Sequence, residues 1–393
     1  MDTQQLAMAA LGEVWGSTVV LDRPESLGGS NRSHVSRYHV VAGGPGDVET
    51  VVVKHAVARA GEQYDPTATD GPAVRLFNDW AGLAFLSECF ANADDSPFPR
   101  FIAGDGTNGL IVMHDIGAGK GLDHYLLGND AAAAEECMTA LFTTLGRVHA
   151  ATCGKQARYD EIRDALGPRK PEVLDEHIQW HREHPIKGLA YLGVDVQKEF
   201  LDEIEECIKV LRDDGPFRVY THHDPCPDNL LWIDGRVYLL DFEFSGMANA
   251  AVDMRYPRAI WPTCWCANRT PGPIIERLEA TYRNELIQGC PAAAEDSLFY
   301  RQMAAGCAEA AMAMIGQDWM KWCIEKMAKL GDFRVVQQMI ARLEGFALVS
   351  EQHNQFPIMG AASRAAATSI RSRMPNDFRE LPMYMAFRGE DPQ

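Results

Sequence analysis

The sequence has no apolar run long enough to cross a membrane. None of its 393 residues lies in a stretch approaching the roughly 18 uninterrupted apolar residues that a transmembrane helix needs. Residues 1–17 also lack a cationic stretch followed by an apolar run, the pattern of a secretory signal. We therefore expect a soluble, cytoplasmic protein that does not associate with membranes.

Positive charge is scarce as well. The chain has 37 Lys and Arg against 55 Asp and Glu, which gives a formal net charge of −18. Nucleic acids are bound through clustered Lys and Arg, so this balance argues against a nucleic-acid partner. Acidity is compatible with a cationic small molecule, although it also simply keeps a soluble protein dispersed. We expect a monomer or a homodimer.

Paired cysteine motifs are nearly absent. The ten cysteines are isolated in the sequence, apart from Cys264 and Cys266, and no second ligand pair stands at the spacing of a zinc site. Many lie inside apolar helical patterns, among them Cys137, Cys207, Cys307 and Cys323. This distribution predicts reduced thiols used as small core residues, as in cytosolic proteins.

The first third of the chain alternates apolar and polar residues as strands do. The pattern is interrupted by turns at Gly28-Gly29 and at residues 43–46. The expected elements are a helix at 3–14, three strands within 17–56, a helix at 73–90, and strands at 98–103 and 109–113. Together they predict a five-stranded antiparallel sheet with one packed helix.

Helical patterns dominate from His114 onward. The expected helices lie at 131–152, 171–183, 197–213 and 273–287 and over most of 293–353, and short strands are expected at 218–220, 230–233 and 237–240. The chain is thus predicted to be an α+β protein with two lobes. The predicted domains are an N-lobe at 1–113, a C-lobe at 114–374 and a loosely attached tail at 375–393.

The most informative stretch is residues 219–241. It contains His222-x-Asp224-x4-Asn229, then an apolar hairpin, then Asp241. A loop between two strands presents Asp224 and Asn229 on one side, and Asp241 arrives from the end of the next strand pair. Such an arrangement suits phosphoryl transfer, with Asp224 as the base, Asn229 and Asp241 as Mg²⁺ ligands, and His222 orienting the loop backbone.

The spacing matches the catalytic-loop signature of kinases. On the segments HHDPCPDNLL and LLDFEFSG, the chain resembles the aminoglycoside phosphotransferase and choline kinase family, small-molecule kinases with the protein-kinase-like fold. Residues 241–260 hold no long activation segment and no Ala-Pro-Glu motif, unlike eukaryotic protein kinases. The resemblance runs from about residue 17 to 257 and implies that Asp253 braces the loop. His223 departs from it, since most relatives carry glycine there.

The strand-rich half supplies nucleotide-binding candidates in the right order. Gly28, Gly29, Ser30 and Asn31 lie between two strands, where backbone amides and the Ser30 hydroxyl would cover the nucleotide phosphates. A glycine pair is also a common hairpin turn. Its position in the sequence, ahead of the catalytic loop, favours the phosphate-binding interpretation.

Lys54 is a cation inside the apolar strand Val51-Val52-Val53. It is either an edge-strand lysine or, given the catalytic loop, the lysine that holds the α- and β-phosphates. The resemblance places its acidic partner on the following helix. Asp79 stands there instead of the usual glutamate, and Glu88 is the alternative.

The resemblance further makes residues 111–115 the hinge between the lobes. Backbone groups near Met113 and His114 would contact adenine, and Met113 would line the pocket. Residues 117–121 look like part of a Walker loop, but the correctly spaced glycine and the following Ser or Thr are missing, so we exclude a P-loop.

These patterns predict an ATP- and Mg²⁺-dependent kinase that phosphorylates a hydroxyl of a small molecule, such as an aminoglycoside, an amino alcohol or a sugar. Asp224, Lys54 and His222 form its predicted catalytic set. The alternatives are a degenerate kinase-like protein that only binds its ligand and a nucleotidyl transferase on the same fold. Candidate acceptor-lining residues are Trp261, Trp265, Glu309, Asp318, Trp319 and Trp322.

Overall fold

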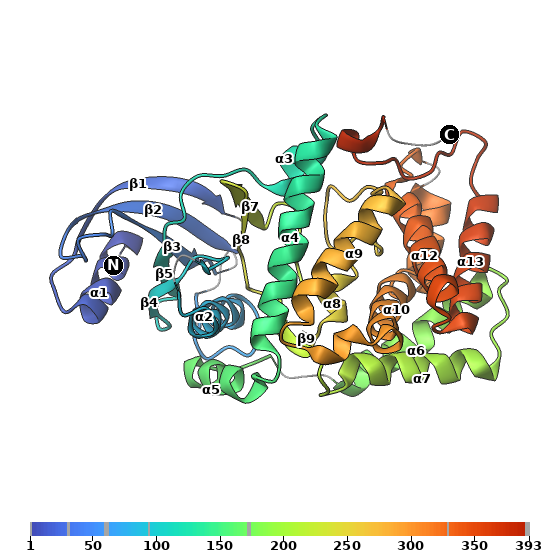
Figure 1. Cartoon of the computed structure of the whole chain (residues 1–393), viewed down its shortest axis with the longest axis horizontal. Helices are drawn as coiled ribbons and strands as arrows, with labels where there is room; N and C mark the ends of the chain where they lie inside the picture. Colours follow the sequence, from blue (N-terminus) through green and yellow to red (C-terminus); the bar gives the residue numbers. More distant parts are fainter. Residues whose placement is uncertain are drawn as a thin grey trace.

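A strand-rich part and a larger helical part lie side by side in the computed structural model of the chain (Figure 1). The structure describes residues 2–29, 32–58, 63–92, 95–170, 174–327 and 330–389. Within these ranges, every helix is too short or too polar to span a membrane.

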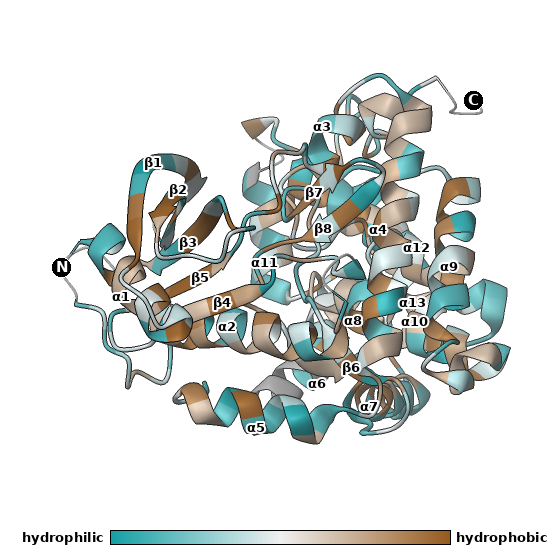
Figure 2. Ribbon diagram, turned by 60° about the vertical axis from the view of Figure 1, so that its left-hand side comes forward, coloured by the Kyte–Doolittle hydropathy of each residue, from teal (hydrophilic) through white to brown (hydrophobic). Residues whose placement is uncertain are grey.

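The strand-rich part is a five-stranded antiparallel sheet in the order β1-β2-β3-β5-β4. Its strands are β1 (Val20–Gly29), β2 (Ser33–Ala42), β3 (Thr50–Ala56), β4 (Phe101–Asp105) and β5 (Leu110–His114). Helices α1 (Thr3–Trp15) and α2 (Pro72–Cys89) cover opposite faces of the sheet (Figure 2). The predicted five-stranded sheet with its packed helix is confirmed.

The alternation of side chains along β3 decides where its lysine points. Val51 and Val53 join the apolar core beneath α1, whereas Val52 joins the core that contains α2. Because successive strand residues face opposite sides of a sheet, Lys54 emerges on the same side as Val52. The strand therefore directs this ammonium group toward α2.

The helical part is built around α4 (Ala131–Thr152), which packs along α9 (Gly272–Leu286). The other elements are α3 (Leu122–Leu126), α5 (Gln156–Leu166), α6 (Leu174–Tyr191), α7 (Lys198–Arg212), α8 (Ala251–Met254), η2 (Pro291–Ala294), α10 (Asp296–Met312), α11 (Gln317–Trp322), η3 (Cys323–Met327), α12 (Arg334–His353) and α13 (Pro357–Ser372). The predicted mainly helical lobe is confirmed. Helix α6 is longer than predicted, since it continues through Pro185.

Two short strand pairs lie within the helical part. Strand β6 (Arg218–Thr221) pairs with β9 (Gly246–Asn249), and β7 (Leu230–Ile233) pairs with β8 (Arg236–Leu239). Residues 222–229 form the loop between β6 and β7, so a paired strand anchors the loop at each end. Strand β9 was not predicted, because Gly-Met-Ala-Asn contains no β-branched or aromatic residue.

Helix α2 touches the helical part directly through Gly82. A Cβ atom at this position would overlap the hydroxyl group of Tyr220 on β6. Glycine therefore lets the helix backbone approach the strand that leads into the 222–229 loop.

The C-terminal segment is more firmly attached than predicted. Leu381, Tyr384 and Phe387 are buried, and Met383 forms a parallel bridge with Arg269. The helix η5 (Met385–Phe387) contacts α3 and α4. The expectation of a loose tail is thus wrong for residues 381–387, because apolar side chains anchor them. The domain limits at 1–113, 114–374 and 375–393 stay predictions.

Phe387→Ala tests this attachment. Removing a fully buried ring should lower the free energy of unfolding by about 3 kcal/mol or more, as is usual for Phe→Ala in a core. Urea titration followed by tryptophan fluorescence measures the change. Met385→Ala, two residues away and 46% exposed, is the matched control and should shift stability by less than about 0.5 kcal/mol. Equal, small effects of both substitutions would mean that the segment contributes little.

Candidate active site

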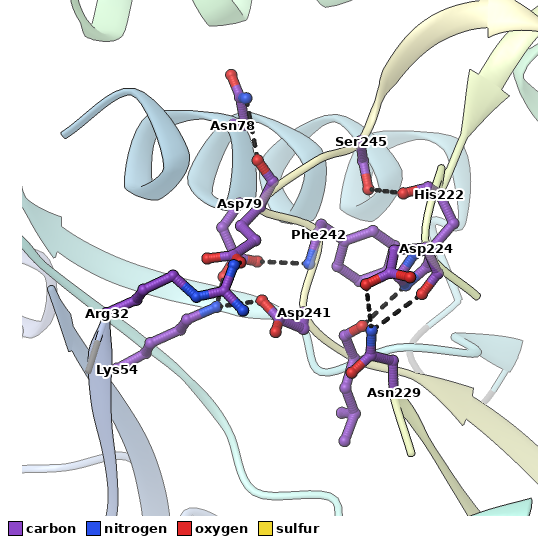
Figure 3. Close-up of polar contacts among 12 residues, drawn as sticks. Arg32, Lys54, Asn78, Asp79, His222, Asp224, Asn229, Asp241, Phe242 and Ser245 are labelled. Atoms are coloured by element: carbon purple, nitrogen blue, oxygen red, sulfur yellow. Dashed lines mark hydrogen bonds and ion pairs between the residues drawn. The ribbon is translucent and has the colours of Figure 1, made fainter. Parts of the chain in front are cut away.

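Lys54 lies at the centre of an ion-pair network between the two parts of the molecule. Its Nζ atom is 2.5 Å from Oδ2 of Asp79 and 2.6 Å from Oδ1 of Asp241 (Figure 3). Burial alone would lower the pKa of Lys54, but the two carboxylates outweigh it and raise that pKa above its ordinary value. The lysine therefore stays charged.

Asp79, rather than Glu88, accepts the Lys54 ammonium. Its second oxygen, Oδ1, accepts a hydrogen bond of 3.2 Å from the backbone N–H of Phe242, the residue after Asp241. Glu88 instead pairs with Arg158 at the surface, with a closest distance of 2.6 Å. The shorter aspartate thus reaches the lysine from α2.

The loop backbone is held by one buried carboxylate. Asp253 accepts hydrogen bonds from the backbone N–H groups of His222 at 2.6 Å and His223 at 2.9 Å. His222 Nε2 lies 2.8 Å from the carbonyl oxygen of Leu240, which directly precedes Asp241. His222 thus links the loop to the Asp241 segment through its ring, and its role in orienting the loop stays a prediction.

Two residues of the helical part hold Asp253 in place. His149 on α4 lies 3.1 Å from its Oδ2, and the Tyr282 hydroxyl on α9 lies 2.7 Å from the other nitrogen of that histidine. Burial would raise the pKa of Asp253, but the hydrogen bond with His149 holds it below its ordinary value. A buried anion therefore organises the loop backbone.

Asn229 holds Asp224 within the loop. Its Nδ2 donates to the backbone carbonyl of Asp224 at 2.9 Å and to the carboxylate Oδ2 at 3.1 Å. Since both amide protons are used, the amide oxygen of Asn229 remains as an acceptor or ligand. Burial raises the pKa of Asp224 above its ordinary value, although a hydrogen bond from Thr263 opposes that shift.

Asp241 lies between Lys54 and the Asp224–Asn229 pair (Figure 3). Its backbone is in the left-handed region, with φ of 62°. Burial would raise the pKa of the Asp241 carboxyl, but Lys54 lowers it below its ordinary value. A carboxylate and an amide oxygen from Asn229 are ligands that Mg²⁺ accepts, so these two residues fit that ion. The described residues contain no cluster of three or more His, Cys, Asp or Glu suited to a metal.

The glycine turn ends β1. Gly28 and Gly29 both have positive φ, 113° and 147°, and a Cβ at Gly29 would overlap the backbone oxygen of Ser33. The turn therefore requires glycine. Ser30 and Asn31, predicted to share in phosphate binding, lie outside the described residues.

The predicted hinge, residues 111–115, lies at the C-terminal end of strand β5. Met113 pairs with Val52 and is buried. His114 is exposed, and its backbone N–H donates to the backbone carbonyl oxygen of Arg100 at 2.9 Å. The following Asp115 accepts hydrogen bonds from Arg37 at 2.5 and 3.0 Å. Adenine contact at this hinge stays a prediction.

His223 points to a cavity of about 280 Å³ between α7, α8, α10 and α13. Its walls are mostly apolar and include the ion pair of Arg255 and Glu309. Burial lowers the pKa of His223, which favours the neutral ring. The side chain that replaces the usual glycine thus lines a cavity of the helical part.

The candidate acceptor-lining residues are not gathered in one place. Trp261 is fully buried against Phe142, so it belongs to the core and lines no open pocket. Trp319 and Trp322 stack on each other and are exposed. Trp265 is 63% exposed and donates from Nε1 to Asp228 in the 222–229 loop at 2.9 Å.

Two interactions at the site were missed by sequence reasoning. Arg32, just after the glycine turn, pairs with Glu243 at 2.6 Å, and Thr263 donates to Asp224 at 2.5 Å. The first joins residues 211 positions apart and the second joins residues 39 positions apart. No local pattern in the sequence marks such pairs.

The expectation that all cysteines are reduced is wrong for two of them. Cys226, within the 222–229 loop, is joined by a disulfide to Cys264, and the other eight cysteines are free thiols. Spacing alone did not reveal the pair, because the two residues are 38 positions apart. Cytoplasmic location, which rested on reduced thiols, stays a prediction.

Comparison with known proteins places the chain among phosphotransferases. The sequence profile of the phosphotransferase enzyme family matches residues 36–289. No curated protein matches the chain in sequence. Solved structures resemble it at low identity.

A choline kinase from Cryptosporidium parvum Iowa II shares 13% identity, covers 88% of this chain and 93% of its own, and gives a TM-score of 0.45. A putative aminoglycoside phosphotransferase from Ralstonia eutropha JMP134 shares 15% identity, covers 94% of this chain and 98% of its own, and gives a TM-score of 0.45. A macrolide 2'-phosphotransferase from Brachybacterium faecium shares 18% identity, covers 79% of this chain and 96% of its own, and gives a TM-score of 0.38.

Thiol counting tests the disulfide. Protein denatured without reductant should react with eight equivalents of a thiol reagent, as the free cysteines do, and with ten after reduction. Mass spectrometry of a digest should find the peptides of Cys226 and Cys264 linked. Ten reactive thiols before reduction in freshly purified protein would contradict the linkage.

Proposed function

The chain belongs to the phosphotransferase enzyme family, as its catalytic-loop motif predicted, and from this premise we propose that it is an ATP- and Mg²⁺-dependent kinase of a small-molecule alcohol. The observation that carries the proposal is the gathering of Lys54, Asp241, Asp224 and Asn229 at one site between the two lobes. Such a site can position a phosphoryl donor and an acceptor together.

Lys54 would bind the nucleotide phosphates. Its ammonium has three donors, two of which go to Asp79 and Asp241. The third can donate to an α- or β-phosphate oxygen without breaking either ion pair. Backbone amides of the turn at Gly28 and Gly29 would approach the same phosphates from the other side.

Asn229 and Asp241 would hold Mg²⁺, which, when bound, neutralises the charge that develops on the phosphate oxygens. The amide oxygen of Asn229 is oriented for this by the two hydrogen bonds that its nitrogen donates to Asp224. Asp241 contributes a carboxylate that stays ionised beside Lys54.

Asp224 would act as the general base. The acceptor hydroxyl oxygen forms a bond to the γ-phosphorus, the bond from that phosphorus to the β,γ-bridging oxygen breaks, and ADP leaves. The hydroxyl proton passes to the Asp224 carboxylate. His222 is assigned no proton transfer, because its ring is engaged with the Leu240 carbonyl oxygen.

The acceptor would be a small molecule with a free hydroxyl, and we propose neither nucleic acid nor membrane as a partner. A screen for ADP release from MgATP with streptomycin, gentamicin, choline, ethanolamine and erythromycin tests the kinase reaction and ranks the acceptors. Pyrophosphate release would instead support the nucleotidyl transferase. Nucleotide binding with neither product would support the degenerate binding protein.

Asp224→Asn tests the base. An amide cannot take the acceptor proton, so turnover should fall roughly 100- to 10,000-fold, the usual contribution of general base catalysis. The KM for ATP should stay close to the native value, because Asp224 makes no contact with Lys54 in the described structure. Asp234→Asn, an exposed carboxylate in the turn between β7 and β8, is the control and should keep near-native turnover. Native turnover in Asp224→Asn would remove Asp224 from its role.

Asp79→Asn tests the lysine partner. Loss of one charge-assisted hydrogen bond to Lys54 costs about 1.5 kcal/mol or more, which corresponds to roughly a tenfold rise in the KM for ATP. Glu88→Gln removes an acid further along the same helix that pairs only at the surface with Arg158, so it should leave the KM within about twofold. The opposite order of effects would restore Glu88 as the partner.

A further inference from the structure

Three consecutive residues outside the 222–229 loop contact three alternate residues within it. Thr263 contacts Asp224, Cys264 is joined to Cys226, and Trp265 contacts Asp228. The segment 263–265 therefore runs beside the loop in register. Neither the catalytic-loop motif nor its spacing encodes this contact, because the segment lies beyond Asp253.

Thr263 is the member that reaches the proposed base. Its Oγ1 donates to Oδ1 of Asp224 at 2.5 Å. The Tyr256 hydroxyl lies 3.0 Å from the same Oγ1 and donates to the backbone carbonyl of His223 at 2.7 Å. Because a carboxylate is a stronger acceptor than a phenol, the single hydroxyl proton of Thr263 goes to Asp224.

The two oxygens of the Asp224 carboxylate are held by different partners. Oδ1 receives the Thr263 hydroxyl, and Oδ2 receives the Asn229 amide at 3.1 Å. The Cys226 Sγ atom also lies 3.1 Å from Oδ1, but a disulfide sulfur has no proton to donate. One hydrogen bond on each oxygen fixes the plane of the carboxylate.

Thr263 is exposed, and a free exposed hydroxyl would exchange between the carboxylate and water. Its neighbours restrict it. The Cys226–Cys264 disulfide fixes the adjacent backbone to the loop, and Tyr256 is buried and bonded to the loop at His223. The hydrogen bond to Asp224 thus forms with little further loss of conformational freedom.

We propose that Thr263 is a positioning residue that orients the Asp224 carboxylate toward the acceptor hydroxyl. This inference rests on the proposed role of Asp224 as the base. Without the hydroxyl, the carboxylate is held at Oδ2 alone and rotates about its Cβ–Cγ bond. The acceptor hydroxyl then meets a correctly oriented base less often, whereas nucleotide binding at Lys54 is unaffected.

Thr263→Val and Thr263→Ser separate the hydroxyl from the shape of the side chain. The valine variant should lose roughly 10- to 100-fold in kcat with the KM for ATP within about twofold, as expected for a misplaced catalytic group. The serine variant keeps the hydroxyl and should recover kcat to within about threefold of the native value. Turnover is measured as ADP release with the panel alcohol that reacts fastest.

Two further variants make the result interpretable. Thr263→Ala should lose kcat as the valine variant does, which excludes a packing effect of the valine. Thr368→Val removes a hydroxyl from the exposed face of α13, where it donates to the carbonyl of Arg364, and should leave kcat and KM unchanged. Thermal unfolding of each variant confirms that it is folded.

Native kcat in Thr263→Val and Thr263→Ala would overturn the inference. So would equal losses in the valine and serine variants, since the hydroxyl would then be irrelevant. If one of these two results is found and Asp224→Asn is inactive, the proposed function stands and the inference about Thr263 fails alone. Native turnover in Asp224→Asn would instead reject the base itself.

Discussion

A buried ammonium group must be paired, and this constraint organises the site around Lys54. An unpaired cation in the interior would lose its charge or destabilise the fold. Two carboxylates pair with it: that of Asp79 on α2 and that of Asp241 in the segment after β8. These two residues are 162 positions apart in the sequence. One lysine therefore brings the sheet, its helix and the Asp241 segment together, before any ligand is considered.

A buried anion plays the corresponding part on the helical side. Asp253 accepts two backbone N–H groups from the 222–229 loop and is supported by His149 on the long helix α4. The backbone at the start of the loop is thus held by the deepest part of the lobe. The proposed base and metal ligands can then be exposed to substrates while their backbone stays rigid.

Periodic and local features of the site were predictable from the sequence. The strand-like alternation within residues 17–56 predicted the first three strands of the sheet, and the helical spacing after Pro72 predicted α2. The spacing from His222 to Asn229 predicted the loop. What was missed depends on contacts between distant residues. The Cys226–Cys264 disulfide, the Arg32–Glu243 pair and the buried C-terminal segment leave no periodicity, because each is set by tertiary packing alone.

The close approach at Gly82 limits how the two lobes can move. Helix α2 carries Asp79 against the sheet and at the same time rests on Tyr220 of the helical lobe without an intervening side chain. Rotation of one lobe against the other must either carry this helix along or open its contact with β6. A rotation that preserves this contact must therefore have its axis close to α2.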